Sequence, residues 1–412
     1  MTIIEDAATL AAPSAAFEAT LAAAPGSMGS PTQALTRSTA RTTVLPTFTA
    51  SAMLLTDRVR YEMGAQLGEG GMGEVALAFD HDIGRSVAVK LLRKDLAGDS
   101  SSLARFVDEI KTVGSLEHPN IVPIHDVGVD ERGRYFFVMK RVEGDTLEAI
   151  IERLAAGDPQ THAQYTFTRR VELMIALLRA LEYAHAQGVV HRDIKPANVM
   201  IGKYGEVVLM DWGVAKPVDA PERPAPGPAE SPTGNDSLRA RMFTTRSGAL
   251  VGTPAYMSPE QARGENLSID QRSDLYSACV LFNELLSLQH YLHGQTTLEG
   301  VLTTISTKDV DVLAAPTHPA QGIVPAELLH ILRRGLQRDP AQRYQNAGEF
   351  IHRLAMALDG TFPVQCPVTF TKRAMRGVAR RLDRNPGLVL AAIGLSLVAI
   401  VTVTVVAVRS LV

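Results

Sequence analysis

The most informative segment of this sequence is His191-Arg192-Asp193-Ile194-Lys195-Pro196-Ala197-Asn198. Its acid, Asp193, can accept the proton of an attacking hydroxyl group. Lys195 can neutralise negative charge on a phosphoryl group, and Asn198 offers a neutral oxygen to a hard cation such as Mg²⁺. These residue types at this spacing favour a site where a hydroxyl group attacks a metal-bound phosphate.

A second acid and a glycine-rich turn accompany this segment. Asp211-Trp212-Gly213 follows the apolar run 207–210, and its acid is suited to hold Mg²⁺ that bridges phosphates. Gly68-Glu69-Gly70-Gly71-Met72-Gly73 matches the pattern G-x-G-x-x-G. A dinucleotide-binding site needs a helix directly after these glycines, but the strand-like run 74–79 follows, and the Gly-Lys-Ser/Thr ending of a Walker loop is missing. A glycine hairpin between strands lets backbone N–H groups approach phosphates.

Lys90 lies in the apolar, strand-like run 86–92. A buried lysine is costly unless an anion lies nearby, so we expect Glu109 of the following helix and the phosphates of ATP to pair with it. Taken alone, Lys90 also fits a lysine at a strand edge whose ammonium group reaches water. The next motif is Gly252-Thr253-Pro254-Ala255-Tyr256-Met257-Ser258-Pro259-Glu260.

Charge and cysteine content exclude several classes of protein. The 412 residues include 41 Lys and Arg against 44 Asp and Glu, a formal net charge of −3. This balance provides no overall attraction to nucleic acid, so we expect no nucleic-acid partner. The two cysteines, Cys279 and Cys366, cannot form a disulfide framework and lack metal-ligand spacing. We expect buried or incidental thiols in a reducing compartment.

The chain divides into regions of different composition. Residues 1–58 are rich in Ala, Thr, Ser and Pro, and we expect disorder because periodic large apolar residues are missing. Acids at Glu5 and Asp6 stand where a secretory signal needs positive charge, so we expect that this segment is not a secretory signal. Residues 61–358 form the predicted folded domain.

Within this domain, strand-like runs come before helical patterns. The strand-like runs are 74–79, 86–92 and 135–139, and the helical patterns are 102–116, 169–186 and 274–288. The pattern 169–186 is apolar nearly all round, as is 274–288, so we expect both helices to be buried. A strand-rich first part and a helix-rich second part predict an α+β, two-lobed fold.

Residues 387–408 carry no charge. A helix of this length spans roughly 33 Å, which matches a bilayer core, so we predict a transmembrane helix rather than a buried core helix. The preceding segment 359–386 predicts a cytoplasmic, membrane-proximal stretch because positive residues beside a span stay inside. Its basic residues are Lys372, Arg373, Arg376, Arg380, Arg381 and Arg384.

Two features of this C-terminal region stay open. The basic segment fits an amphipathic helix lying on membrane lipid, and it fits a solvated flank of the span equally well. Four residues follow the predicted span, so the chain is either tail-anchored or cut short there. In both cases we expect a single-pass protein of the cell membrane with its folded domain in the cytoplasm.

In this order and at this spacing, the motifs make the chain resemble a bacterial eukaryotic-like serine/threonine protein kinase over about residues 61–355. The resemblance implies the two-lobed protein kinase fold with a small β-rich lobe and a large helical lobe. It also implies ATP and Mg²⁺ as ligands and protein Ser and Thr hydroxyls as substrates. Signal transduction is the implied setting. We also expect autophosphorylation and a dimer, because membrane anchoring raises the local concentration of a second copy.

The resemblance assigns roles to the matching residues. Lys90 grips the α- and β-phosphates of ATP and pairs with Glu109. Asp193 orients the substrate hydroxyl and takes its proton, with Lys195 beside it. The residues that match the metal-binding positions are Asn198 and Asp211.

The resemblance also implies a nucleotide pocket. Met139 matches the gatekeeper, and the backbone from Lys140 to Val142 matches the hinge. The implied pocket residues are Leu67, Gly68, Gly70, Gly73, Val75, Ala88, Lys90, Met139, Lys140, Val142 and Met200. Outside the pocket, the resemblance implies that Asp274 braces the catalytic loop and that Arg343 pairs with Glu260.

Some positions depart from the family pattern. Trp212 replaces the usual Phe, Ser258 replaces the usual Ala, and Lys140-Arg141 replaces an acidic-aromatic pair in the hinge. A Pro-rich insertion at 216–237 is interpreted as a solvated loop, or as a docking site for a proline-binding partner.

Arg192 resembles the arginine that senses a phosphorylated activation segment. Thr244, Thr245 and Ser247 are therefore candidate phosphorylation sites, or else ordinary polar loop residues.

Two other functions compete with an active protein kinase. A catalytically inactive pseudokinase acting as a membrane scaffold would have lost Lys90, Asp193 or Asp211, and all three are present. A small-molecule kinase is disfavoured because the segment 252–260 resembles the peptide-binding segment of protein kinases.

Overall fold

The computed structural model of the protein describes residues 60–70, 73–96, 99–212, 216–217, 253–312 and 318–363, with isolated residues beyond them. The predicted disordered segment 1–58 and the candidate phosphorylation sites at 244–247 lie outside the described residues. So does the predicted span 387–408, apart from Gly394, Val398 and residues 401–403. Within the described part, none of the helices combines the length and apolar character that crossing a bilayer requires.

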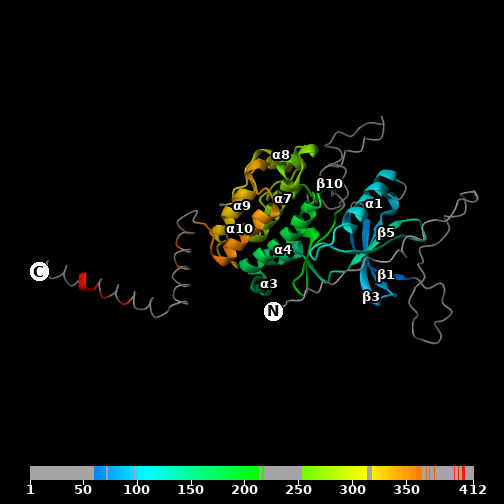
Figure 1. The fold of residues 1–412 in the computed structure, drawn as a ribbon, viewed down its shortest axis with the longest axis horizontal. Helices are drawn as coiled ribbons and strands as arrows, with labels where there is room; N and C mark the ends of the chain where they lie inside the picture. Colours follow the sequence, from blue (N-terminus) through cyan, green and yellow to red (C-terminus); the bar gives the residue numbers. More distant parts are fainter. Residues whose placement is uncertain are drawn as a thin grey trace, which may run out of the picture.

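The first lobe is an antiparallel five-stranded sheet with the strand order β1-β2-β3-β5-β4. Its strands are β1 (Tyr61–Glu69), β2 (Gly73–Asp80), β3 (Arg85–Leu92), β4 (Ile124–Val129) and β5 (Tyr135–Lys140). Helix α1 (Ser100–Gly114) lies beside this sheet (Figure 1). The strand-like runs 74–79, 86–92 and 135–139 and the helical pattern 102–116 are therefore confirmed, with ends that differ by at most two residues.

The side chains of β3 alternate between the two faces of the sheet, as in any extended strand. The residues buried on the outer face are Val87, Val89 and Leu91. Ala88 and Leu92 are buried on the opposite face, in the main core with Phe106 of α1. Lys90 shares this second face, and β3 lies between β2 and β5. The interpretation of Lys90 as an edge lysine is therefore wrong.

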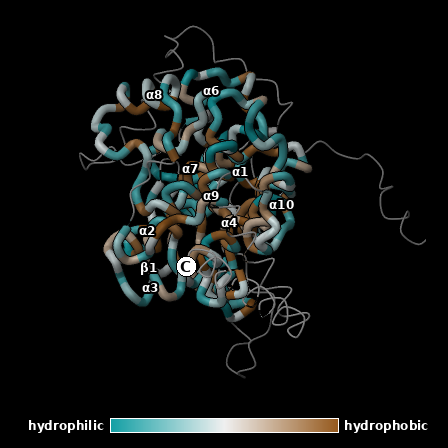
Figure 2. Tube along the Cα trace, turned by 90° about the vertical axis from the view of Figure 1, so that its left-hand side faces the viewer, coloured by the Kyte–Doolittle hydropathy of each residue, from teal (hydrophilic) through white to brown (hydrophobic). Residues whose placement is uncertain are grey.

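The second lobe is mainly helical. Its helices are α2 (Leu147–Ala155), α3 (Pro159–Gln164), α4 (Phe167–Ala186), α6 (Pro259–Ala262), α7 (Gln271–Ser287), α8 (Leu298–Thr307), α9 (Ala326–Gly335) and α10 (Ala347–Asp359). Figure 2 shows apolar residues gathered around α4, α7 and α9, with polar residues on the outside. The core is continuous with the inner face of the first lobe.

The two long predicted helices form, but they differ in burial. Helix α7 is buried over nearly its whole length, as expected. Helix α4 buries one side and exposes Glu172, Arg179 and Glu182 on the other. The expectation that 169–186 is buried all round is therefore wrong, because its charged residues recur at helical spacing and face water.

Short strands of the second lobe carry the loops that contain the predicted chemical residues. Strands β6 (Gly144–Thr146), β8 (Val199–Gly202) and β9 (Val207–Leu209) form one small sheet, and β7 (Val189–Val190) pairs with β10 (Lys216–Pro217). Residues 191–198 connect β7 to β8, and Asp211 follows β9. The β8–β9 pairing therefore brings the ends of both loops to one place.

Candidate active site

Lys90 joins the two lobes at the cleft between them. Its Nζ donates to Glu109 Oε1 of α1 at 2.6 Å and to Asp211 Oδ1 after β9 at 3.0 Å. The Lys90 and Glu109 side chains are 11% and 2% exposed, whereas that of Asp211 is 47% exposed. The structure thus brings together three predicted residues from three separate elements. Of these, Asp211, the candidate for metal binding, is the one exposed to solvent.

The electrostatics of this group follow from its burial and its partners. Burial opposes the positive charge on Lys90, but the carboxylates of Asp211 and Glu109 outweigh burial and raise the Lys90 pKa above its ordinary value. The neighbouring Lys90 charge holds the pKa of Asp211 below its usual range. Asp211 is therefore an anion at neutral pH, which is the state that a cation ligand needs.

The loop 191–198 places Asp193 next to Lys195 and Asn198. Asp193 Oδ2 accepts from Lys195 Nζ at 2.8 Å and from Asn198 Nδ2 at 3.2 Å, and Asn198 Nδ2 also donates to the Asp193 carbonyl at 2.8 Å. The amide nitrogen of Asn198 is thereby used within the loop. Its Oδ1 is the atom left to bind a cation.

Left-handed backbone conformations occur at two positions of the site. Arg192 has φ 69° and Asp211 has φ 59°, values that are uncommon for residues other than glycine. Asp274 of α7 stabilises the first turn, because its carboxylate accepts from the backbone N–H groups of His191 and Arg192 at 2.8 Å each. The predicted bracing role of Asp274 is confirmed.

His191 connects the two loops of the site. Its Nδ1 accepts from the Asp193 N–H at 3.2 Å, so its Nε2 is the donor to the Met210 carbonyl at 3.1 Å. Its ring also packs against Trp212, with centroids 4.5 Å apart. Burial lowers the pKa of His191, so the neutral ring required by these two bonds is the stable form. As a result, His191 fixes the backbone at Asp193 relative to the backbone just before Asp211.

Strand register places the predicted nucleotide pocket. Val75 pairs with Gly68 on β1 and with Lys90 on β3, and Ala88 pairs with Met139 on β5. The pocket residues differ in burial: Ala88 and Met139 are buried, Leu67 and Lys140 are exposed. Val75, Val142 and Met200 are partly buried. Ala88 and Met139 belong to the main core, and Val75, Val142 and Met200 pack against it.

The glycines of the hairpin do not have equal steric roles. A Cβ on Gly73 would lie 2.8 Å from the Leu91 carbonyl oxygen and 3.2 Å from Lys90 Cγ, so only glycine fits beside Lys90. A Cβ on Gly68 would meet nothing within 4 Å, and one on Gly70 would meet only the Gly73 carbonyl. Space at Gly68 and Gly70 is therefore open to a ligand. Gly71 lies outside the described residues.

The residues present fit a magnesium ion held jointly with phosphates. Asp211 supplies an ionised, half-exposed carboxylate and Asn198 supplies an amide oxygen. In the described ranges, no group of three or more His, Cys, Asp or Glu side chains is placed to hold a metal ion. Mg²⁺ is commonly bound by one or two carboxylates together with substrate phosphates, which matches this donor set.

Comparison with known proteins agrees with this geometry. A protein kinase domain model matches residues 61–353. The chain belongs to the protein kinase family. It is 37% identical over 330 residues to a probable serine/threonine-protein kinase of Streptomyces coelicolor, an alignment covering 79% of this chain and 44% of that protein. It is 34% identical over 316 residues to serine/threonine-protein kinase PknB of Mycobacterium tuberculosis, covering 76% and 45%. The chain therefore spans less than half the length of these relatives.

The kinase domain contains a buried ion pair that was predicted from the family resemblance. Arg343 Nη1 and Nη2 donate to Glu260 Oε1 and Oε2, both at 2.8 Å, and both side chains are almost fully buried. Ser273 also donates to Glu260 at 2.6 Å. The pair fixes the segment that begins α6 against the loop before α10.

Two contacts around the loop 191–198 were not predicted. Gln261 Nε2 donates to the Arg192 carbonyl at 2.9 Å, and His185 Nε2 contacts Asp274 Oδ2 at 2.8 Å. Ser258 begins α6 with a capping box in which it exchanges hydrogen bonds with Gln261. The spacing Ser-x-x-Gln could have revealed this cap from the sequence, and it gives a role to the unusual Ser258.

Proposed function

We propose that this chain is a protein serine/threonine kinase that transfers the γ-phosphoryl group of Mg-ATP to Ser and Thr hydroxyls of proteins. The observation that carries the proposal is the contact of Lys90 with both Glu109 and Asp211, in the same cleft as the Asp193–Lys195 pair. The names of the relatives, which describe serine/threonine-protein kinases, support the same activity.

Each residue contributes a separate part of the reaction. Asp193 orients the substrate hydroxyl and accepts its proton, and Lys195 supplies positive charge beside the transferred group. Lys90 binds the α- and β-phosphates, and Glu109 holds its ammonium in place from α1. Asn198 and Asp211 would hold Mg²⁺, which would offset the negative charge of the phosphate oxygens.

The activity is tested with labelled ATP, Mg²⁺ and a generic protein substrate. Lys90→Met should abolish transfer because the phosphates lose their cation, while Lys94→Met, an exposed lysine four positions along the same segment, should behave as wild type. Labelling of the protein substrate separates this function from a small-molecule kinase. If the wild-type protein transfers no phosphate, the result favours the pseudokinase. If the Lys90→Met variant labels the substrate as strongly as wild type, the result refutes the assigned site.

We propose further that residues 387–408 anchor the kinase in the cell membrane, with the kinase domain in the cytoplasm. The support is the uncharged run of 387–408 behind a basic segment. Deleting 387–412 should release the kinase into the soluble fraction. Continued sedimentation with membranes after a high-salt wash would show that another segment is the main anchor.

We also propose that the kinase phosphorylates a second copy of itself in signal transduction. Thr244 and Thr245 are the candidate acceptors, and anchoring raises the local concentration of the second copy. Mass spectrometry should find phosphate on one of these threonines in wild-type protein and none in the Lys90→Met variant. If the peptides that contain Thr244 and Thr245 are unmodified in fully active wild-type protein, phosphorylation of these threonines is not part of the activity.

A further inference from the structure

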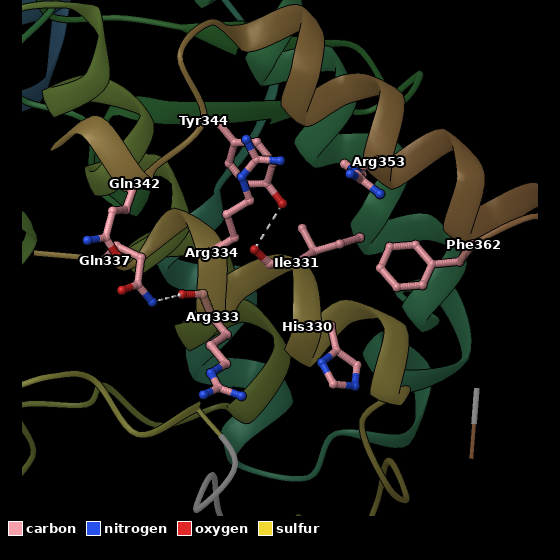
Figure 3. A pocket seen from close by; sticks show the side chains of 9 residues that line it. All are labelled: His330, Ile331, Arg333, Arg334, Gln337, Gln342, Tyr344, Arg353 and Phe362. Atoms are coloured by element: carbon pink, nitrogen blue, oxygen red, sulfur yellow. Dashed lines mark hydrogen bonds between the residues drawn. The ribbon is translucent and has the colours of Figure 1, made fainter. Parts of the chain in front are cut away.

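A cavity of about 390 Å³ lies on the second lobe, away from the cleft, between α9 and α10. We call it the basic cavity, defined by the residues that line it. These are His330, Ile331, Arg333, Arg334, Gln337, Gln342, Tyr344, Arg353 and Phe362. Three arginines and no carboxylate line it, so its electrostatic character is cationic. Figure 3 shows these side chains on α9, on the loop before α10, on α10 and on the residues after it, with Arg333 and Arg353 pointing in different directions.

The arginines of the basic cavity are paired to different degrees. Arg334 contacts Glu349 and lies over the ring of Tyr344, 4.8 Å from its centroid. Among the described residues, no carboxylate forms an ion pair with Arg333 or Arg353. Two positive charges of the cavity are therefore not balanced by this part of the chain, and an anion from outside can balance them.

The base of the cavity is rigid. Tyr344 is buried, its hydroxyl donates to the Ile331 carbonyl at 3.1 Å, and its ring stacks on Phe350 with centroids 4.6 Å apart. Arg334 is held on this ring, and the side chain of Gln337 bonds the Arg333 carbonyl at 2.7 Å (Figure 3). Of the three arginines, Arg334 is the one whose guanidinium is fixed on this ring. Guanidinium groups match the oxygens of a phosphate better than lysine ammonium groups do.

The position of the cavity in the chain indicates the source of that phosphate. Phe362, a lining residue, stands at the end of the kinase domain, and the six basic residues between Lys372 and Arg384 follow it. The uncharged run begins at 387, only 25 positions after Phe362. If that run lies in a bilayer, the short connection keeps the cavity near the lipid headgroups, where even weak binding is effective.

We propose that the basic cavity binds the phosphate of an anionic phospholipid headgroup and thereby docks the α9–α10 face of the kinase domain on the bilayer. The inference rests on the membrane anchor proposed above. Helices α9 and α10 lie on the side of the second lobe away from the first lobe (Figure 1). Docking through this face leaves the cleft with Lys90 and Asp193 free to receive a protein substrate.

The test uses the full chain in lipid nanodiscs with a fluorescent reporter. Cys366→Ser removes one of the two cysteines, and Cys279 is buried, so Ala341→Cys beside the cavity can be labelled alone. A quencher on the lipid headgroup should reduce its emission in nanodiscs that contain phosphatidylglycerol, and much less in pure phosphatidylcholine. A label at Glu131→Cys, in the turn between β4 and β5, should not be quenched in either.

Charge reversal then assigns the contact to the cavity. Arg333→Glu/Arg353→Glu should weaken the phosphatidylglycerol-dependent quenching by at least about tenfold, because each basic residue at an anionic surface contributes several-fold. Arg132→Glu/Arg179→Glu, which reverses two exposed charges elsewhere, should retain it. Quenching in the cavity variant equal to wild type would overturn the proposal and assign the contact to the basic segment 372–384. Absence of lipid-dependent quenching in wild type would overturn it as well.

Separate measurements identify a failure of the underlying proposals. Retention of the chain in nanodiscs reports the anchor, and phosphoryl transfer to a protein substrate reports the kinase and its correct folding in each variant. If the chain is not retained, preformed phosphatidylglycerol vesicles replace the nanodiscs. The proposal that the cavity binds lipid phosphate is then supported if Arg333 and Arg353 are needed for quenching by these vesicles. It is refuted if they are not needed.

Discussion

In the cleft between the lobes, Lys90 contacts Glu109 and Asp211, and Lys195 contacts Asp193. In the basic cavity between α9 and α10, Arg333 and Arg353 contact no carboxylate of the described residues. The difference indicates two uses of charge. Paired charges hold side chains in position for chemistry, whereas unpaired cations at a surface are available to an external anion.

The largest expected effect is at the acid of the catalytic loop. Asp193→Ala should lower phosphoryl transfer by about 10²- to 10⁴-fold, because the substrate hydroxyl loses the group that orients it and takes its proton. Asp145→Ala removes a half-exposed acid that pairs with Arg153, and it should leave the rate close to wild type. Rates are compared with labelled ATP. Similar rates for the two variants would remove Asp193 from the mechanism.

Stability should distinguish a buried paired arginine from an unpaired one. Arg343→Met leaves Glu260 buried without its cation and should lower the free energy of unfolding by about 3–5 kcal/mol. Arg333→Met changes an exposed side chain and should alter it by no more than about 0.5 kcal/mol. Chemical denaturation of both variants measures the difference. An equal loss for both would mean that Arg333 has a structural partner.

The pH dependence of stability tests the brace under the catalytic loop. Burial acts to raise the pKa of Asp274, but hydrogen bonds from His185 and from backbone N–H groups outweigh it and lower that pKa. A lowered folded pKa means that this contribution is fully present above the unfolded pKa of about 4 and is lost as the pH falls from there through the folded value.

Asp274→Asn should therefore be less stable than wild type at neutral pH, by about 1.5–3 kcal/mol. It should also lose less stability than wild type as the pH falls below about 4. Asp145→Asn, an exposed acid, serves as the control and should follow the wild-type profile. Parallel profiles for Asp274→Asn and wild type would contradict the lowered pKa.

The smallest expected effect is spectroscopic. Trp212, the one tryptophan of the sequence, is buried against His191 and directly follows Asp211. Because Asp211 would hold Mg²⁺ in the proposed reaction, binding of Mg-ATP should change the intrinsic emission by a modest amount. Trp212→Phe should remove this signal and keep transfer within several-fold. Constant emission at saturating Mg-ATP would separate Trp212 from the metal site.

Much of the cleft could be predicted from the sequence because its residues sit in short motifs with local structure. The short apolar run 86–92 with its β-branched residues predicted a strand around Lys90, and the acid after 207–210 was expected to follow a strand. The proposed nucleotide and catalytic positions came from the order and spacing of these motifs. Burial was less predictable: the charged face of α4 was overlooked because its apolar residues dominated the pattern.

By itself, the sequence determined which side chains are available for chemistry and which strands and helices carry them, because both depend on nearby residues. Tertiary structure alone decided the long-range contacts. Lys90 meets Asp211 from 121 positions away, and Gln261 reaches the Arg192 carbonyl from 69 positions away. The basic cavity is a product of packing too, since Arg333 and Arg353 read as ordinary surface residues until α9 and α10 lie side by side. Periodicity encodes the face of an element, but not the partner against which that face packs.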